Sequence, residues 1–248
     1  MSGLLANKLS IITGAGSGIG KATCKIFSRE GACVIAADKN IQSALNIKNE
    51  ISNINENKHS AFELNVCDKS SLENVLNSIV NDYNKPPSIV VNCAGITKDN
   101  FLLKMSEQDF DDVINVNLKG TFLMMQTFAN AMVAAKQQGS IVNIASIVGK
   151  TGNIGQVNYT ASKSGVEAMT RTASKEFGKF GVRVNAVLPG FIISPMTDTV
   201  PDKVKQMIIA FNALRRFGQP EEIGEVIAFL ASSRSSYING ASIEVTGG

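Results

Sequence analysis

The sequence predicts an α/β protein in which one parallel β-sheet is covered by helices on both faces. Short, nearly continuous apolar runs alternate along the 248 residues with segments of helical periodicity. This alternation is typical of a parallel sheet that is buried on both sides. A glycine-rich turn follows the first apolar run directly. With right-handed crossovers, these features predict a doubly wound fold of the Rossmann type.

Seven apolar runs are the expected strands, and the segments between them are the expected helices. The strands are expected at residues 9–13, 33–37, 60–64, 88–92, 140–145, 182–188 and 242–246. Helical patterns are clearest at residues 19–31, 40–54, 70–80, 113–135 and 157–177. The chain shows no internal repeat, low-complexity tract or linker, so we expect a single domain over residues 1–248.

One long segment departs from this alternation. Residues 194–218 follow an expected strand, contain Pro195 and Pro201, and then turn helical. Long excursions at the carboxyl edge of a parallel sheet often cover a ligand, so we expect a substrate lid here, with an ordinary long connection as the alternative.

Composition argues against several classes of function. The net charge is +3 without a basic run, and aromatic residues make up 6% of the chain with no Trp, so a nucleic-acid-binding surface has little support. We expect no membrane span, because no apolar run reaches the necessary length. The eight residues before the first run carry one charge, Lys8, so neither a signal peptide nor an arginine-rich transit peptide is expected.

The cysteines and the single histidine do not form a metal motif. Cys24, Cys33, Cys67 and Cys93 contain no C-x-x-C pair, and free thiols in a reducing compartment are expected rather than disulfides or zinc ligands. His59 lies in the polar stretch NENKH, so we expect a solvated loop residue and no bound metal.

The glycine-rich turn has the pattern expected of a phosphate cradle. In TGAGSGIG, Gly14, Gly18 and Gly20 follow a strand and open an amphipathic helix. A chain in this position must turn tightly, approach a pyrophosphate closely and point its first helical amides at the anion. The context favours a nucleotide cofactor over a plain glycine-rich turn.

The end of the second strand predicts which cofactor is used. Asp38 lies 18 residues after Gly20, where a carboxylate accepts hydrogen bonds from the adenosine ribose and repels a 2′-phosphate, so we expect NAD(H). A helix N-cap is the alternative role for Asp38, and the adjacent Lys39 argues weakly for a phosphate.

Tyr159 and Lys163 are four residues apart in NYTASKSG, so they share one face of a helix. They form either a surface pair or an acid–base pair in which the ammonium lowers the pKa of the phenol. Transfer of a hydride to a ketone leaves an alkoxide that needs a proton, which Tyr159 could supply, while Ser146 could polarise the carbonyl.

The four side chains Asn117, Ser146, Tyr159 and Lys163, together with the glycine spacing, resemble the short-chain dehydrogenase/reductase family. NCAG at 92–95, PGFI at 189–192 and the C-terminal RFGQPEEIGEVIAFLAS extend the resemblance over essentially the whole chain. Within the family, the sequence is most similar to 3-oxoacyl-acyl-carrier-protein reductases and type 8 17-beta-hydroxysteroid dehydrogenases.

The resemblance implies an NAD-dependent oxidoreductase of lipid metabolism that interconverts 3-oxoacyl and (3R)-3-hydroxyacyl thioesters of a carrier protein or CoA. Hydroxysteroid oxidation, and a non-catalytic cofactor-binding subunit of a hetero-oligomeric reductase, are the alternatives. Asn117 would hold a water that links Lys163 to solvent. The implied cofactor-binding residues are Gly14, Ser17, Gly18, Ile19, Asp38, Asn65, Val66, Asn92, Ala94, Gly95, Tyr159, Lys163, Pro189, Gly190, Ile192 and Ser194.

Three departures from the family pattern matter, and one of them is that Gln137 and Phe180 stand where bacterial members can carry arginines that dock a carrier protein. Asn65 stands where the family usually has an aspartate, and Cys93 replaces an asparagine. The helical segments 113–135 and 157–177 are unusually apolar or rich in small residues, which predicts subunit contacts. The resemblance implies a homotetramer, or a heterotetramer with a second short-chain reductase similar to carbonyl reductase type 4, located in the mitochondrial matrix or otherwise in the cytoplasm.

Overall fold

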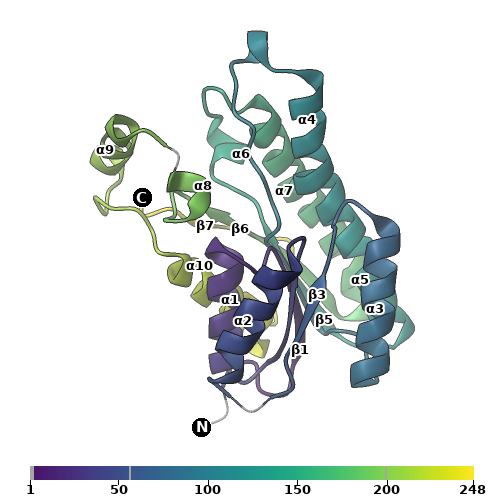
Figure 1. Ribbon diagram of the computed structural model, residues 1–248. Coiled ribbons are helices and arrows are strands. Elements are labelled where there is room, and N and C mark those ends of the chain that lie inside the picture. Colours follow the sequence, from purple (N-terminus) through teal and green to yellow (C-terminus); the bar gives the residue numbers. More distant parts are fainter. Residues whose placement is uncertain (1–2, 56, 199) are drawn as a thin grey trace.

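The computed structural model describes residues 3–55, 57–198 and 200–248, and over these residues all seven strands form one parallel sheet (Figure 1). The order across the sheet is β3-β2-β1-β4-β5-β6-β7. The strands are β1 Leu9–Thr13, β2 Cys33–Asp38, β3 Ser60–Glu63, β4 Ile89–Asn92, β5 Gly139–Ile144, β6 Val182–Pro189 and β7 Ser242–Val245. Every boundary lies within one residue of the predicted one, so the predicted fold class is confirmed.

The helices connect these strands. They are α1 Gly18–Arg29, α2 Ile41–Ser52, α3 Lys69–Tyr83, α4 Glu107–Val113, α5 Thr121–Ala134, α6 Val148–Thr151, α7 Val157–Phe177, α8 Pro195–Asp198, α9 Asp202–Phe211 and α10 Pro220–Ala231. A π-helical segment, η2 (Ile114–Gly120), joins α4 to α5. The helix expected at 113–135 therefore begins six residues earlier and contains a local change of pitch.

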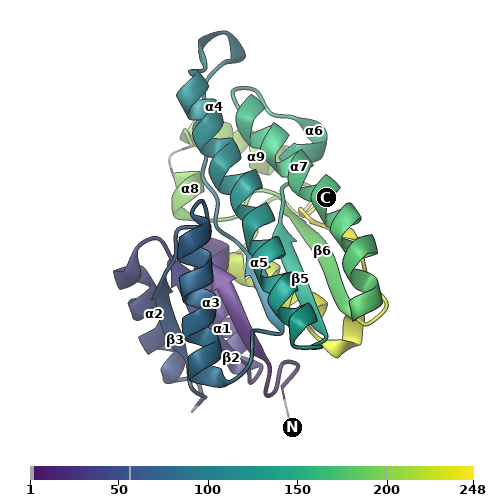
Figure 2. The same cartoon turned by 90° about the vertical axis from the view of Figure 1, so that its right-hand side faces the viewer.

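Each face of the sheet carries its own hydrophobic core. Helices α1, α2 and α10 cover one face, where Ile12 and Val91 of the strands pack against Phe27 and Ile227. Helices α3, α5 and α7 lie side by side on the other face (Figure 2), where Ile11 packs in a cluster with Phe128. Successive residues of one strand point to opposite faces, so Ile11 and Ile12 enter different cores.

The order of the strands reverses between β1 and β4. The chain proceeds from β1 through β2 to β3 in one direction, and from β4 through β5, β6 and β7 in the other. The ends of β1 and β4 are adjacent, with Thr13 paired in register with Asn92. The connections after these two strands diverge to opposite faces and leave a crevice at the carboxyl edge, which is where doubly wound proteins bind ligands.

The prediction for His59 was wrong. Only 6% of its surface is exposed, and its Nδ1 accepts a hydrogen bond from the Val34 amide at 3.1 Å. Its Nε2 lies 3.0 Å from Oδ1 of Asn55, whose amide group also donates to the Ser28 carbonyl. The polar residues between α2 and β3 form hydrogen bonds with the end of α1 instead of with water. Their polar composition alone therefore wrongly suggested an exposed loop.

The four cysteines are free thiols. Cys24 is fully buried and the other three are half-buried. Burial raises the pKa of the Cys93 thiol to about 12, so it stays protonated at neutral pH. Among the described helices, none has the length and apolar character needed to cross a bilayer.

Candidate active site

A cleft of about 820 Å³ occupies the crevice between the ends of β1 and β4. Its floor depends on residues without side chains. Gly14 has a φ of +62°, and a Cβ there would lie 3.0 Å from the backbone of Ala94. Gly18 has a φ of +49° at the first position of α1. Both positions favour glycine, and the Ser17 side chain makes no cap bond, which leaves the first amides of α1 available to an anion.

Asp38 lines the same cleft at the end of β2. Its carboxylate accepts hydrogen bonds from the Gly16 amide at 2.9 Å and the Asn40 amide at 3.0 Å. Asn40, and not Asp38, caps α2, because its side chain accepts from the Ser43 amide at 3.2 Å. The alternative role of Asp38 as the N-cap of α2 is therefore wrong, and its carboxylate is held at the wall of the cleft.

Most of the predicted cofactor-binding residues lie around this cleft. It is lined by Gly14, Ser17, Gly18, Ile19, Asp38, Asn65, Val66, Ala94, Gly95, Tyr159, Lys163 and Ser194. A second, smaller cavity of about 160 Å³ adjoins it and is lined by Pro189, Gly190, Ile192 and Ser194, together with Ser146 and Tyr159. Asn92 lines neither cavity. It is 4% exposed, and its amide group donates to Asn143 Oδ1 at 2.8 Å.

Three of the four predicted catalytic side chains meet where the two cavities join. Tyr159 and Lys163 lie on α7, and Ser146 follows β5. Tyr159 lines both cavities, Ser146 the smaller one and Lys163 the larger one. Ser146 and Tyr159 face the same smaller cavity, and Lys163 Nζ lies 5.6 Å from the centre of the Tyr159 ring. The pair is not a surface pair, because Lys163 is only 5% exposed.

The electrostatics of the pair differ from the prediction. Burial raises the pKa of Tyr159 to about 12, the hydrogen bond from Ser146 opposes this rise, and the Asp99 carboxylate adds to it. Burial also lowers the pKa of Lys163 to about 8. Its ammonium donates to the Ile144 carbonyl at 2.7 Å. In the protein alone, therefore, Lys163 does not bring the pKa of the phenol toward neutrality, because desolvation dominates at both groups.

Asn117 lies behind this site in η2 and is fully buried. Its Oδ1 accepts from the Ile96 amide at 2.9 Å, and its Nδ2 donates to the Ile96 carbonyl at 3.0 Å and to Ser162 Oγ at 3.1 Å. A Cβ built on Gly95 would lie 3.3 Å from Asn117 Oδ1 and 3.5 Å from Lys163 Nζ. The structure thus brings Asn117 close to Lys163 while using its amide to hold the segment after β4.

The cleft fits a nicotinamide dinucleotide. Its glycines leave room for a pyrophosphate at the first amides of α1, and the Asp38 carboxylate lies at its wall. Asn92 Oδ1 is buried without a hydrogen-bond partner, next to Cys93 and Ala94, which line the cleft. Lys163 and Ser194 also line the cleft, and Ser194 lines the smaller cavity together with Tyr159. The side-chain oxygen of Asn65 is already engaged within the protein, since it accepts a hydrogen bond from the Cys67 amide at 3.1 Å.

Several residues that line the cavities were not predicted from the sequence. Asp112, Asn115 and Lys119 line the larger cavity from α4 and η2, and Thr97, Asp99 and Gln156 line the smaller one. For Thr97 and Asp99 the only sequence signal was position, because they lie shortly after the NCAG segment at the end of a strand. The lid prediction placed residues 194–218 over the site, and Ser194 and Met196 line both cavities, whereas residue 199 lies outside the described part of the chain.

Comparison with known proteins extends this picture. Residues 14–248 match the protein family described as "Enoyl-(Acyl carrier protein) reductase". The chain is 48% identical over 250 residues to (3R)-3-hydroxyacyl-CoA dehydrogenase of Rattus norvegicus, covering 98% of this chain and 96% of that protein. It is 46% identical over 244 residues to 3-oxoacyl-acyl-carrier-protein reductase FabG of Thermotoga maritima, covering 98% of both.

A solved structure of a putative short-chain alcohol dehydrogenase from Sinorhizobium meliloti 1021 superposes with a TM-score of 0.93. It is 28% identical in sequence, and the match covers 98% of this chain and 96% of that one. The glycine-rich cradle, the buried Tyr159–Lys163 pair and these matches lead to one conclusion. The chain belongs to the short-chain dehydrogenase/reductase family.

Proposed function

We propose that this protein is an NAD-dependent oxidoreductase that interconverts 3-oxoacyl and (3R)-3-hydroxyacyl thioesters. The observation that carries the proposal is the position of Ser146 and Tyr159 at the junction of a dinucleotide-sized cleft and a smaller cavity, with Lys163 beside Tyr159 on the same helix. The two curated relatives named above, one a 3-hydroxyacyl-CoA dehydrogenase and one a 3-oxoacyl reductase, support the same substrate class.

The side chains of this protein would position the substrate and move one proton. When bound, the nicotinamide supplies the hydride to the carbonyl carbon, or accepts it in the opposite direction. Ser146 Oγ donates a hydrogen bond to the carbonyl oxygen and so stabilises the charge that develops there. Tyr159 gives its phenolic proton to that oxygen, which completes the hydroxyl group. The ammonium of Lys163, with a pKa of about 8, is largely protonated at neutral pH and stabilises the resulting phenolate.

The smaller cavity suits a flexible acyl chain. Its walls include Val148, Phe191, Met196 and Val200. Phe211 of α9 is 85% exposed and Met207 is 54% exposed, and neither lines the cavity, so these two side chains add nothing to its apolar wall. A rigid steroid needs a closely fitted apolar pocket, whereas a thioester can extend out to solvent.

We also propose NAD(H) as the preferred cofactor, because the Asp38 carboxylate is fixed at the cleft wall and would repel a 2′-phosphate. For the assembly we propose a homotetramer, or a heterotetramer with a second short-chain reductase, formed through α5 and α7. The exposed Phe122 of α5, with 43% of its surface accessible, supports contacts on that face. The mitochondrial matrix is proposed only from the resemblance to the type 8 branch.

The test is a direct comparison of kcat/KM for acetoacetyl-CoA, a longer 3-oxoacyl-CoA and estrone, each measured with NADH and NADPH. We expect the thioesters with NADH to give the highest values. A clear preference for the steroid would overturn the substrate assignment, and turnover of none of the three would favour a non-catalytic subunit.

A further inference from the structure

The residue before the catalytic tyrosine joins three separate segments of the chain. Asn158 is fully buried at the start of α7. Its Nδ2 donates to the Lys98 carbonyl at 2.9 Å and to the Asp109 carbonyl at 3.2 Å. Its Oδ1 accepts from the amide of Tyr159 at 2.7 Å. One side chain thus connects α7, the segment after β4, and α4.

The bond to Tyr159 matters because of where Tyr159 lies in the helix. It is the third residue of α7, and the first four amides of a helix have no partner within it. Gln156, the residue that precedes α7, makes no side-chain cap bond. The Asn158 side chain therefore satisfies the Tyr159 amide and fixes the backbone that carries the phenol.

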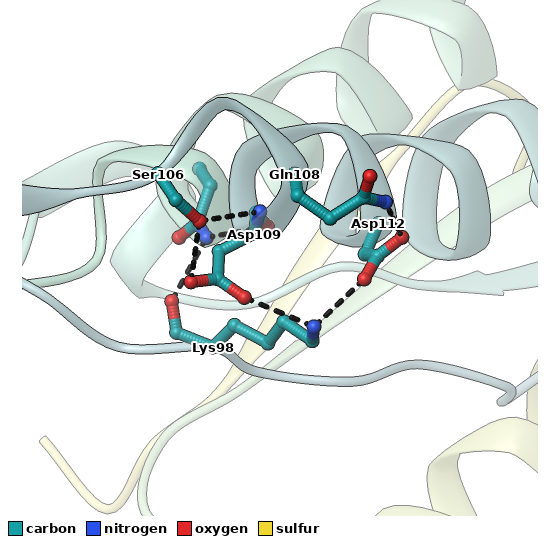
Figure 3. Close-up of polar contacts among 6 residues, drawn as sticks. Lys98, Ser106, Gln108, Asp109 and Asp112 are labelled. Atoms are coloured by element: carbon teal, nitrogen blue, oxygen red, sulfur yellow. Dashed lines mark hydrogen bonds and ion pairs between the residues drawn. The ribbon is translucent and has the colours of Figure 1, made fainter.

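The two carbonyls that Asn158 binds are themselves held together by charges. Figure 3 shows the Lys98 ammonium between the carboxylates of Asp109 and Asp112. Lys98 Nζ lies 2.9 Å from Asp109 Oδ1 and 2.7 Å from Asp112 Oδ2. Ser106 Oγ donates to the other oxygen of Asp109 at 2.7 Å, and Gln108 Nε2 donates to the other oxygen of Asp112 at 2.7 Å. The two ion pairs of Lys98 hold α4 against the segment after β4, and so they keep both acceptors of Asn158 in place. The bonds from Ser106 and Gln108 lie within the first turns of α4 itself.

The same cluster borders the larger cavity, and the residue next to it borders the smaller one. Asp112 lines the larger cavity. Asp99, next to Lys98, lines the smaller one, and its carboxylate accepts from Gln156 Nε2 at 2.9 Å. A change in the position of this cluster would be transmitted through Asn158 to the backbone of Tyr159.

We propose that Asn158 is a positioning residue for Tyr159, and that the ion-paired cluster of Lys98, Asp109 and Asp112 keeps the partners of Asn158 in register. This inference rests on the proposed role of Tyr159 as the acid–base group. The phenol must lie within hydrogen-bond distance of both Ser146 and the substrate oxygen. A displacement of about 1 Å in such a site is enough to lower a rate by ~100-fold.

Two variants of Asn158 separate positioning from simple stability. Asn158→Asp keeps the oxygen that accepts from the Tyr159 amide but loses the donor to the Lys98 and Asp109 carbonyls. Asn158→Ala loses all three bonds. We expect kcat to fall by roughly 10-fold in Asn158→Asp and ~100-fold in Asn158→Ala, with KM and the NADH dissociation constant changed by less than about threefold. Gln108→Ala, which touches only Asp112 in this cluster, is the matched control and should keep kcat within about twofold.

A loss of folded protein would not reproduce this pattern. The concentration of folded active sites is measured by NADH titration, and kcat is expressed per site that binds NADH. Unfolded molecules bind no NADH and therefore do not affect this value. The pH profile of kcat for alcohol oxidation gives a second readout. The groups that face the Tyr159 phenol are Ser146, Lys163 and Asp99. Ser146 lowers the pKa of the phenol, so a displacement of the phenol away from Ser146 raises that pKa. We therefore expect the apparent pKa of the oxidation profile to move upward in both Asn158 variants.

Tyr159→Phe is measured in parallel. If Tyr159→Phe loses activity but both Asn158 variants keep the wild-type kcat per site and the wild-type pH profile, the positioning role is overturned and the proposed function stands. If Tyr159→Phe retains activity, the proposed function itself is wrong. A lower kcat in Gln108→Ala equal to that in Asn158→Ala would also overturn the inference, because the loss would then reflect a general disturbance of α4.

Discussion

At the scale of single residues, the buried ammonium of Lys163 shows how function and stability oppose each other. It donates to the Ile144 carbonyl, and no carboxylate is among the causes of its altered pKa. The ordinary pKa of a lysine is about 10.4, and the value of about 8 here means that the folded protein binds this proton less tightly than the unfolded chain does. The charge is therefore a cost to folding that the proposed chemistry explains.

We predict that Lys163→Met raises the free energy of unfolding at pH 7 by about 1–3 kcal/mol while abolishing turnover. Below pH 8, lysine is protonated in both states and the cost of burial is complete. Between pH 8 and 10.5, the folded protein releases the proton first, so the wild-type protein gains stability as the pH rises. The advantage of Lys163→Met should consequently shrink between pH 7 and 9.5. Urea denaturation at both pH values measures it, and an advantage that does not depend on pH would contradict the assignment.

For Tyr159 we predict a selective loss of chemistry. Tyr159→Phe removes the proton donor but keeps the ring, so NADH should bind with a dissociation constant close to that of the wild-type protein. Turnover should fall by at least ~100-fold, the scale of general acid–base catalysis. Fluorescence titration with NADH and steady-state kinetics test the two halves separately, and near-normal turnover would show that another group donates the proton.

At the scale of elements, the titratable ring of His59 holds the connection between α2 and β3 against its neighbours. His59 accepts from the Val34 amide through Nδ1, so its neutral form is required there. Burial lowers its pKa, and nearby Lys48 lowers it further. The ring thereby links β2 to the end of α1, where Ser28 Oγ lies 3.4 Å from its Nε2.

We predict that the wild-type protein loses stability as the pH falls below about 6.5, the ordinary pKa of histidine. There the unfolded chain takes up a proton that the folded protein excludes. In His59→Asn, the amide oxygen can still accept from Val34 and does not titrate. The difference in unfolding free energy between wild type and His59→Asn should thus change by about 1 kcal/mol between pH 7.5 and 5 in the direction that favours the variant. Parallel curves over this range would show that His59 does not titrate in this way.

At the scale of the whole molecule, the cleft lies where the two halves of the sheet meet. It is lined from one half by Gly14 and Asp38 and from the other by Tyr159 and Lys163. A ligand that needs residues from both halves binds the folded protein but not the unfolded chain, and it therefore stabilises the whole fold.

We predict that NADH at ~100 times its dissociation constant adds about 2.7 kcal/mol to the stability and raises Tm by roughly 5–10 °C. NADPH at the same concentration should raise Tm less, because its 2′-phosphate meets the Asp38 carboxylate. In Asp38→Ser the two shifts should become similar or exchange order, since Lys39 is then free to pair with the phosphate. Thermal melts with each cofactor test this, and a larger shift with NADPH in the wild-type protein would contradict the proposed preference.

The sequence by itself determined the architecture. Strand boundaries were predictable to within one residue because a parallel sheet covered on both faces needs continuous apolar runs, and helix α7 was predicted at its observed bounds, Val157–Phe177. The glycine positions at 14 and 18 were predictable because a tight turn into a helix needs residues without side chains. Tyr159 and Lys163 could be paired because a spacing of four residues places them on one helix face, and the resemblance to the family added Ser146 at the end of a strand.

Only the tertiary structure decided the environment of these groups. The raised pKa of Tyr159 and the lowered pKa of Lys163 follow from desolvation by residues distant in sequence, and no local pattern encodes it. The burial of His59 depends on how a polar connection folds against α1. Asn158 binds Lys98 and Asp109, which lie 60 and 49 positions before it in the sequence. Such contacts exist only once the helices have packed. Local sequence sets the period and the turns, whereas burial and long-range hydrogen bonds set the chemistry.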